Sequence, residues 1–115
     1  MMIRNFFSAA SALQAAHAGK GKIKNTQVYN AADFSTNVQF IIYSELKPGT
    51  SIGYHMHQNN EEIYVILEGK GIMSINGEEH EVAAGDIILN KPYWSHGLEN
   101  NSDTDLKILV FEVHA

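Results

Sequence analysis

The sequence contains no cysteine among its 115 residues and a single arginine, Arg4. Without cysteine the chain cannot form a disulfide, supply a thiol nucleophile or hold a metal through thiolates. Any metal ion must therefore be bound by histidine, glutamate or aspartate. Long apolar runs are also missing, since none approaches the roughly 18 to 20 residues that a membrane-spanning helix needs. We therefore expect a cytoplasmic protein that has no membrane partner.

Positive charge is scarce as well. The chain has 8 basic and 13 acidic residues, which gives a net charge of −5. This balance removes the general attraction to nucleic acid that a basic domain has, so we expect no nucleic-acid partner. The segment 1–32 is the exception, because it carries four basic residues and no acidic one.

The length and composition predict one folded domain. Hydrophobic residues make up 44% and charged residues 18% of the chain, a globular balance that disordered chains lack. We expect a barrel domain over residues 23–115, preceded by an N-terminal segment over 1–22. That segment reads as a short amphipathic helix, with Phe6, Phe7, Ala10 and Leu13 on one face, or as an irregular stretch.

Beyond residue 23 the sequence is typical of an all-β protein. Short segments rich in Val, Ile, Tyr and Phe alternate with Gly, Asn, Pro and Asp every 8 to 12 residues or so. The pair Asn76-Gly77 predicts a tight hairpin, because both central residues of a type I′ turn need positive φ. We expect strands near 24–29, 38–46, 51–57, 63–67, 71–75, 78–82, 86–89, 94–98 and 106–113.

Four side chains suggest a metal site. His55 and His57 are two residues apart on an expected strand, so both project from the same face. Glu62 begins the next strand, and His96 lies on a later one. A pair of histidines by itself is equally consistent with two solvated side chains. The complete set would supply three imidazoles and one carboxylate.

The spacing of these residues carries a family resemblance. The sequence contains Gly49-x5-His55-x-His57-x4-Glu62-x6-Gly69, followed by Gly85-x10-His96-x3-Asn100. These patterns resemble the two signature motifs of the cupin superfamily, over roughly residues 36–113. The surrounding residues are similar to small single-domain cupins of the oxalate-decarboxylase-like kind. The resemblance implies a double-stranded β-helix, or jelly-roll barrel.

One part of the second motif departs from the family. The family places a proline six and a glycine eight residues after the first glycine of this motif. Here those positions hold Lys91 and Tyr93, with Pro92 between them. We therefore expect a reshaped turn before His96.

The resemblance implies a divalent metal bound by His55, His57, Glu62 and His96. A mixed nitrogen and oxygen site suits Mn²⁺, Fe²⁺, Ni²⁺, Co²⁺ or Zn²⁺, and we favour manganese or iron. Four protein ligands on an octahedral ion leave two positions open for a ligand. Strand alternation directs Glu61 to the opposite face from Glu62, toward solvent.

Other polar and aromatic residues are candidates for the pocket. Alternation places Tyr64 beside Glu62 and Trp94 beside His96, although both fit an ordinary core equally well. Gln39 and Tyr43 share one face of the expected strand 38–46, and the sequence leaves open which face points inward. We expect His80 and His114 to be solvated. His17 either is solvated at a helix end, which we favour, or caps a pocket.

These observations favour a metal-dependent enzyme that acts on a small carboxylate or another oxygenated metabolite, as a decarboxylase, dioxygenase or isomerase. The alternative is a cupin that binds a small molecule or sugar without turnover. Because Arg4 lies outside the motifs, no arginine clamp is available in the barrel. We expect a small anionic or chelating ligand. We also expect a homodimer built from β-sheet faces, in which the N-terminal segment packs on the partner or crosses to it and association covers Phe6 and Phe7.

Overall fold

The computed structural model describes residues 2–115, and their regular structure is almost entirely β. The strands are β1 (Ala12–Gln14), β2 (Ile23–Asn30), β3 (Val38–Leu46), β4 (Ser51–Met56), β5 (Asn60–Glu68), β6 (Lys70–Ile75), β7 (Glu78–Ala83), β8 (Ile87–Asn90), β9 (Ser95–Glu99) and β10 (Leu106–His114). One turn of 3-10 helix, η1 (Ala31–Asp33), follows β2. No helix in residues 2–115 is long and apolar enough to cross a membrane.

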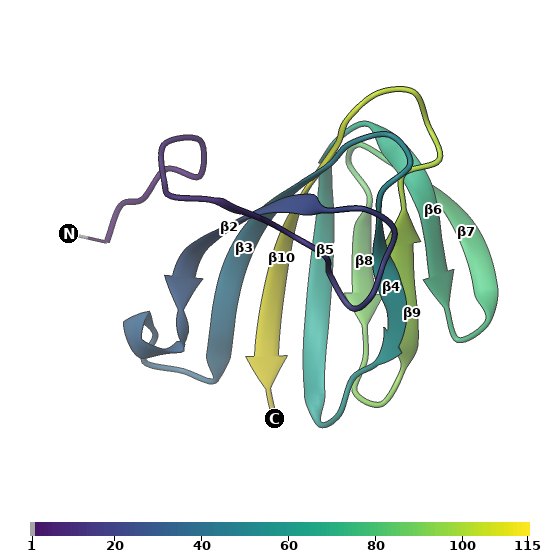
Figure 1. Cartoon of the computed structure of the whole chain (residues 1–115). Coiled ribbons are helices and arrows are strands. Elements are labelled where there is room, and N and C mark those ends of the chain that lie inside the picture. Colours follow the sequence, from purple (N-terminus) through teal and green to yellow (C-terminus); the bar gives the residue numbers. More distant parts are fainter. Residues whose placement is uncertain (1) are drawn as a thin grey trace.

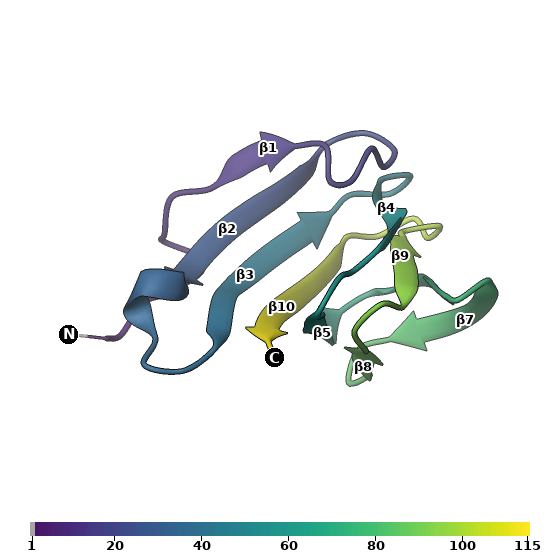
Figure 2. The same ribbon diagram turned by 90° about the horizontal axis from the view of Figure 1, so that it is seen from below.

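The strands form two antiparallel sheets that face each other (Figure 1). One sheet has the order β1-β2-β3-β10-β5-β8, and the other has the order β4-β9-β6-β7. Figure 2 shows the first sheet curving round from β1, with β4, β9 and β7 beside it. This arrangement is the jelly-roll barrel that the sequence predicts, and each expected strand has a counterpart in it.

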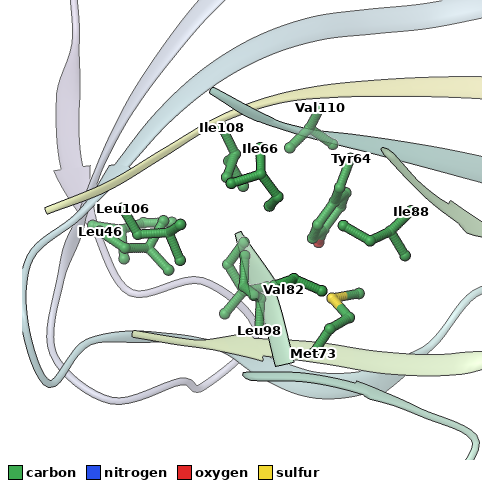
Figure 3. Packing of buried hydrophobic residues seen from close by; sticks show 12 residues of the cluster. Leu46, Tyr64, Ile66, Met73, Val82, Ile88, Leu98, Leu106, Ile108 and Val110 are labelled. Carbon is green, nitrogen blue, oxygen red and sulfur yellow. The ribbon is translucent and has the colours of Figure 1, made fainter. Parts of the chain in front are cut away.

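The core fills the space between the sheets (Figure 3). Inward-facing residues alternate along each strand, as Glu62, Tyr64 and Ile66 do on β5. Tyr64 and Ile66 belong to the apolar core, whereas Glu62 is a buried charge at its end. The core side chains labelled in the figure are Leu46, Tyr64, Ile66, Met73, Val82, Ile88, Leu98, Leu106, Ile108 and Val110. The barrel therefore has an apolar interior that gives way to polar groups near Glu62.

The predicted hairpin is confirmed. Asn76 and Gly77 have φ values of 47° and 83°, and they join β6 to β7 with Ile75 opposite Glu78. Both values lie in the left-handed region that a type I′ turn requires.

The N-terminal segment is irregular and carries a short strand, so the irregular reading is confirmed and the amphipathic helix is wrong. Residues 12–14 form β1, which pairs with the edge of β2. Phe6 stacks on Tyr43 with ring centroids 4.2 Å apart, while Phe7 remains exposed. A helix this short is marginal in water, whereas the sheet edge offers backbone partners and Tyr43 offers an aromatic surface.

The turn before His96 holds Tyr93 in a strained conformation. Tyr93 has a φ of 64°, although the family places a glycine at this position. The left-handed region costs a non-glycine residue about 1–2 kcal/mol. The expected reshaping of this turn is thus small, because the tyrosine adopts a backbone conformation suited to glycine.

Replacing Tyr93 by glycine should therefore stabilise the protein. We expect the free energy of unfolding to rise by about 1 kcal/mol, which corresponds to a gain of about 4 °C or more in Tm for a domain of this size. Tyr93→Val should lower Tm, because a β-branched residue tolerates positive φ poorly. Thermal unfolding of the two variants checks this, and a lower Tm for Tyr93→Gly would contradict it.

Candidate metal centre

Three imidazoles and one carboxylate meet inside the barrel. His55 lies on β4, His57 immediately after it, Glu62 on β5 and His96 on β9. One ligand atom from each residue lies within 4.8 Å of the others. Residues far apart in sequence meet because β4 pairs with β9, which places His55 directly opposite His96. The structure thus brings together all four residues that the motifs single out.

The spacing of the ligand atoms suits a metal ion. The Nε2 atom of His57 lies 3.1 Å from Nε2 of His55 and 3.3 Å from Nε2 of His96. Glu62 Oε1 lies 3.2 Å from Nε2 of both His57 and His96. Neighbouring ligands of an octahedral ion with bonds of about 2.1 Å are about 3.0 Å apart. The four atoms therefore have nearly the separation that one ion requires.

Hydrogen bonds fix two of the imidazole rings. His55 Nδ1 lies 2.6 Å from the carbonyl oxygen of Gly53, which can only accept, so this nitrogen carries the proton. His57 Nδ1 lies 3.0 Å from Asn60 Oδ1, and the amide of Asn60 donates to Glu112 at 2.9 Å. His57 Nδ1 is therefore also a donor. In the neutral rings the Nε2 lone pairs face the centre of the site, as metal binding requires.

The arrangement of the ring nitrogens fits a cation at its centre. The Nε2 lone pairs of neutral His55 and His57 would face each other across 3.1 Å. Two lone pairs at this distance repel unless a proton or a metal ion lies between them. The donor set of three nitrogens and one carboxylate oxygen matches that of first-row divalent metals. The residues present therefore fit a metal.

Glu62 and His55 have shifted pKa values that favour their metal-binding forms. Burial alone would raise the pKa of the Glu62 carboxyl, but hydrogen bonds from His57 and His96 outweigh it and lower that pKa to about 2. Desolvation lowers the pKa of His55 to about 4. At neutral pH Glu62 is therefore ionised and His55 is neutral, the forms in which each can bind a metal.

Two buried polar groups near the centre have no partner among residues 2–115. Neither polar atom of the Asn90 side chain has a hydrogen bond, and Asn90 pairs with Glu62 across β8 and β5. The Nδ1 atom of His96 is also without a partner. Such groups are rare in folded interiors and often mark a site completed by water or an ion.

The four predicted pocket residues, Tyr64, Trp94, Tyr43 and Gln39, differ in how they lie relative to the centre. Tyr64 is buried beside the centre, with its hydroxyl 3.4 Å from His96 Nε2, and burial raises its pKa well above the ordinary value. Trp94 is partly exposed, and its carbonyl accepts a hydrogen bond from the backbone N–H of His57. Tyr43 and Gln39 lie on the opposite face of β3 from Ile42. Ile42 lines a small cavity beside Glu62, which is described below. Phe6 covers Tyr43 on that outer face.

The remaining polar candidates lie away from the centre or at its edge. Glu61 is not part of the four-residue cluster, as alternation predicts. His80 and His114 are exposed and lie near Glu78 and Glu112 respectively. His17 differs from the expectation of simple solvation, because its ring stacks on the ring of His55.

A turn of the N-terminal segment carries His17 to the centre. The His17 and His55 rings are nearly parallel, with centroids 3.5 Å apart. His17 and Ala18 both have positive φ, at 50° and 55°. Backbone contact with β4 holds this turn, because a Cβ on Gly53 would come within 1.9 Å of the His17 carbonyl. Two adjacent strained residues persist only where the surroundings determine their conformation.

This stacking leads to a prediction for His17. His17→Ala should weaken metal binding several-fold, because the His55 ring loses the surface that fixes its orientation. His17→Phe should restore most of the affinity, since a flat aromatic ring can replace the stack. Metal titrations of both variants measure this effect. An equal loss in the two variants would contradict a positioning role, and no loss in either would contradict any role.

A small cavity adjoins the centre. It has a volume of about 80 Å³ and is lined by Glu62 and Tyr64 of β5 together with residues of β2, β3, β4, β10 and the His17 turn. Its lining residues are Ala16, His17, Ile23, Asn25, Phe40, Ile42, Ser44, Ile52, Glu62, Tyr64 and Val110. A larger hollow of about 760 Å³ lies between β6, β7 and the loop before β10, and none of the four ligand residues lines it. Of these two hollows, only the small cavity is lined by a residue of the cluster, Glu62.

Asn100, the last residue of the second motif, has a different role. Its amide donates to the carbonyls of Leu46 and Thr104, each at 2.8 Å, and its oxygen accepts from Ser102. Asn100 thus holds the loop between β9 and β10 rather than the metal centre.

Comparisons with known proteins agree with this geometry. Residues 42–112 match the family model of the cupin domain. The chain is 29% identical to the oxalate-binding protein of Thermotoga maritima over 110 residues, which are 96% of this chain and 91% of that protein. It is 44% identical to an uncharacterised protein of Methanocaldococcus jannaschii over 61 residues, about half of each chain. The crystal structure of a predicted oxalate decarboxylase from Thermotoga maritima matches with a TM-score of 0.95 and 26% identity, and the match covers 98% of this chain and 99% of that one.

Proposed function

The chain belongs to the cupin family, and we propose that it is a metal-dependent member that binds and transforms a small carboxylate such as oxalate. The observation that carries this proposal is the convergence of three imidazole nitrogens and one carboxylate oxygen beside a small cavity. A bound divalent ion would supply Lewis acidity and two positions for ligand oxygens. The name of the Thermotoga relative supports oxalate as the first ligand to test.

The polypeptide has defined tasks in this proposal. His55, His57, Glu62 and His96 would hold the ion, and Asn60 would keep His57 in the required tautomer. Tyr64 keeps its proton because burial raises its pKa, so its hydroxyl can donate a hydrogen bond toward the centre. Tyr64 belongs to the apolar core, which limits the access of water to the centre from the barrel interior.

We propose manganese or iron as the ion. Both accept mixed nitrogen and oxygen ligands and octahedral coordination, which leaves room for a chelating ligand. Metal analysis of protein purified without added metal should find about one of these ions per chain. Zinc at full occupancy would contradict this choice but not the site itself.

A turnover assay tests the enzymatic part of the proposal. The metal-loaded protein is incubated with oxalate under air and under nitrogen, and carbon dioxide, formate and hydrogen peroxide are measured. Product formation that disappears in Glu62→Gln, but not in Glu61→Gln, would support catalysis at the centre. These two glutamates are neighbours on β5, and only Glu62 belongs to the cluster.

The second candidate function is binding without turnover. The Thermotoga relative is described by binding alone, and no arginine lines the small cavity among the residues that the structure describes. Saturable oxalate binding by the metal-loaded protein, with no product under air or nitrogen, would favour this function. Failure to bind any small carboxylate would contradict both candidates.

We also propose that the protein is a homodimer. Tyr54 and Met56 of β4 are more than half exposed, and so is Ile87 of β8. Both strands lie at sheet edges, where unpaired backbone groups and apolar side chains favour association. Sedimentation velocity should find a dimer at micromolar concentration, and a monomer would overturn this proposal. Phe6 does not need a partner for its burial, since it already packs on Tyr43.

A further inference from the structure

We propose that Asn25 selects the ligand of this site, by donating a hydrogen bond to the end of the ligand that faces away from the metal. This inference rests on the proposed function and adds a specificity-determining residue to it. Asn25 lies on β2, two strands away from β10 and outside both sequence motifs. It nevertheless lines the same small cavity as Glu62.

The size of the cavity brings both walls within reach of one small molecule. Its volume of about 80 Å³ would hold about five water molecules, because each needs roughly 15 Å³ of cavity volume measured in this way. This is far below the roughly 300–1,000 Å³ of pockets that hold larger ligands. A ligand that reaches the metal from this cavity therefore lies in the same small space that the Asn25 side chain lines.

The neighbouring residue Ser44 orients the Asn25 side chain. Asn25 and Ser44 are register partners on β2 and β3, and the Ser44 hydroxyl donates to Asn25 Oδ1. Ser44 is buried, so water does not compete strongly for this bond. With its oxygen engaged, Asn25 presents its Nδ2 protons as donors, and no acceptor for them occurs in the part of the chain that the structure describes.

These donors define the class of ligand. The metal and the amide N–H groups would both favour ligand oxygens, and Glu62 and Asn25 line one small cavity whose other walls are largely apolar. A planar dicarboxylate such as oxalate has oxygens at both ends, whereas acetate has them at one end only. The cavity has no arginine to orient a ligand carboxylate. The neutral amide of Asn25 can orient it instead, because its N–H groups are directional hydrogen-bond donors even though they carry no full charge.

Calorimetric titration of the manganese-loaded protein tests this assignment. We compare oxalate with acetate as ligands for the wild type, Asn25→Ala, Asn25→Asp and the control variant Gln27→Ala. Gln27 is also on β2 and lines, together with Asn25, a neighbouring hollow, but it does not line the cavity beside Glu62. Metal content is measured for each variant, so that loss of ligand binding is separated from loss of the ion.

The expected pattern is specific to Asn25. Asn25→Ala should weaken oxalate binding about 5- to 30-fold, the loss of one hydrogen bond to a charged group. Asn25→Asp should weaken it about 100-fold or more, because it removes the donor and adds a like charge. Acetate affinity in Asn25→Ala and oxalate affinity in Gln27→Ala should stay unchanged. Ser44→Ala should produce a smaller loss for oxalate, since the amide can then rotate.

The outcomes separate this inference from the proposed function. If the wild type binds oxalate and both Asn25 variants bind it equally well with full metal, the role of Asn25 is overturned while the proposed function stands. If acetate binding weakens as much as oxalate binding in Asn25→Ala, the selective role is likewise overturned. If the metal-loaded wild type binds no dicarboxylate, both proposals fall.

Discussion

Glu62→Gln should lower the affinity of the protein for its metal by about 100-fold or more. The change is nearly isosteric, but it replaces the only carboxylate of the cluster with a neutral amide. Loss even of a group that merely supports a metal ligand commonly costs 10- to 100-fold in affinity, so loss of a charged ligand should cost at least as much. Burial makes the effect larger, because the Glu62 charge is little screened by water.

The neighbouring residue supplies the control for this experiment. Glu61→Gln removes the same charge from the same strand, but from the face that points away from the cluster. Isothermal titration with Mn²⁺ of the metal-free wild type and both variants gives the affinities directly. Equal affinities in the two variants would contradict a ligand role for Glu62.

Metal affinity should fall by about tenfold for each unit of pH below the pKa of His57. Hydrogen bonding to Glu62 raises this pKa above its ordinary value in the metal-free protein, although burial acts against it. His57 must lose its proton before Nε2 can bind an ion, so protons compete with the metal at low pH and not at high pH. The pKa values of Glu62 and His55, about 2 and about 4, lie too low for either group to compete near pH 6.

The pH dependence is measured by titrating metal into the protein between pH 5 and 8. We expect a plateau in affinity at the alkaline end and a decline that begins at or above pH 6.5, the ordinary pKa of histidine. His80→Gln should leave the profile unchanged, because His80 is exposed and lies outside the cluster. Affinity that is constant over this range, or that rises as the pH falls, would contradict proton competition at His57.

The four metal-site residues could be predicted because their spacing reflects strand geometry. His55 and His57 share a face by alternation, and the motifs add Glu62 and His96. The supporting residues could not be found in this way. Asn60 and Glu112 support His57 through a contact between residues 52 positions apart, and Asn25 meets the cavity only because β2 pairs with β3 in one register. Such contacts depend on strand pairing, which the sequence of a single strand does not contain.

The position of Tyr43 shows a second limit of predictions that rest on strand alternation. The pattern of β3 predicts which residues share a face, but not which face points into the barrel. The structure places Ile42 and Ser44 at the cavity and Tyr43 outside, where Phe6 packs against it. An aromatic residue buried by the N-terminal segment looks the same in sequence as one buried in the core.

The sequence leaves open whether the N-terminal segment is helical or irregular, for a related reason. Phe6, Ala10 and Leu13 recur at helical spacing, yet residues 12–14 pair with the edge of β2 and His17 reaches the metal centre through two residues of positive φ. Periodicity reports which residues could share a helix face, but the available tertiary partners decide the outcome.

Metal titration of the His55→Ala/His57→Ala double variant tests the central claim most directly. Wild-type protein freed of metal should bind one Mn²⁺ per chain, and the double variant should bind none at micromolar concentration while its far-ultraviolet circular dichroism remains that of a folded β protein. A folded double variant that retains one full equivalent of metal would contradict the assignment of His55, His57, Glu62 and His96 as the metal site.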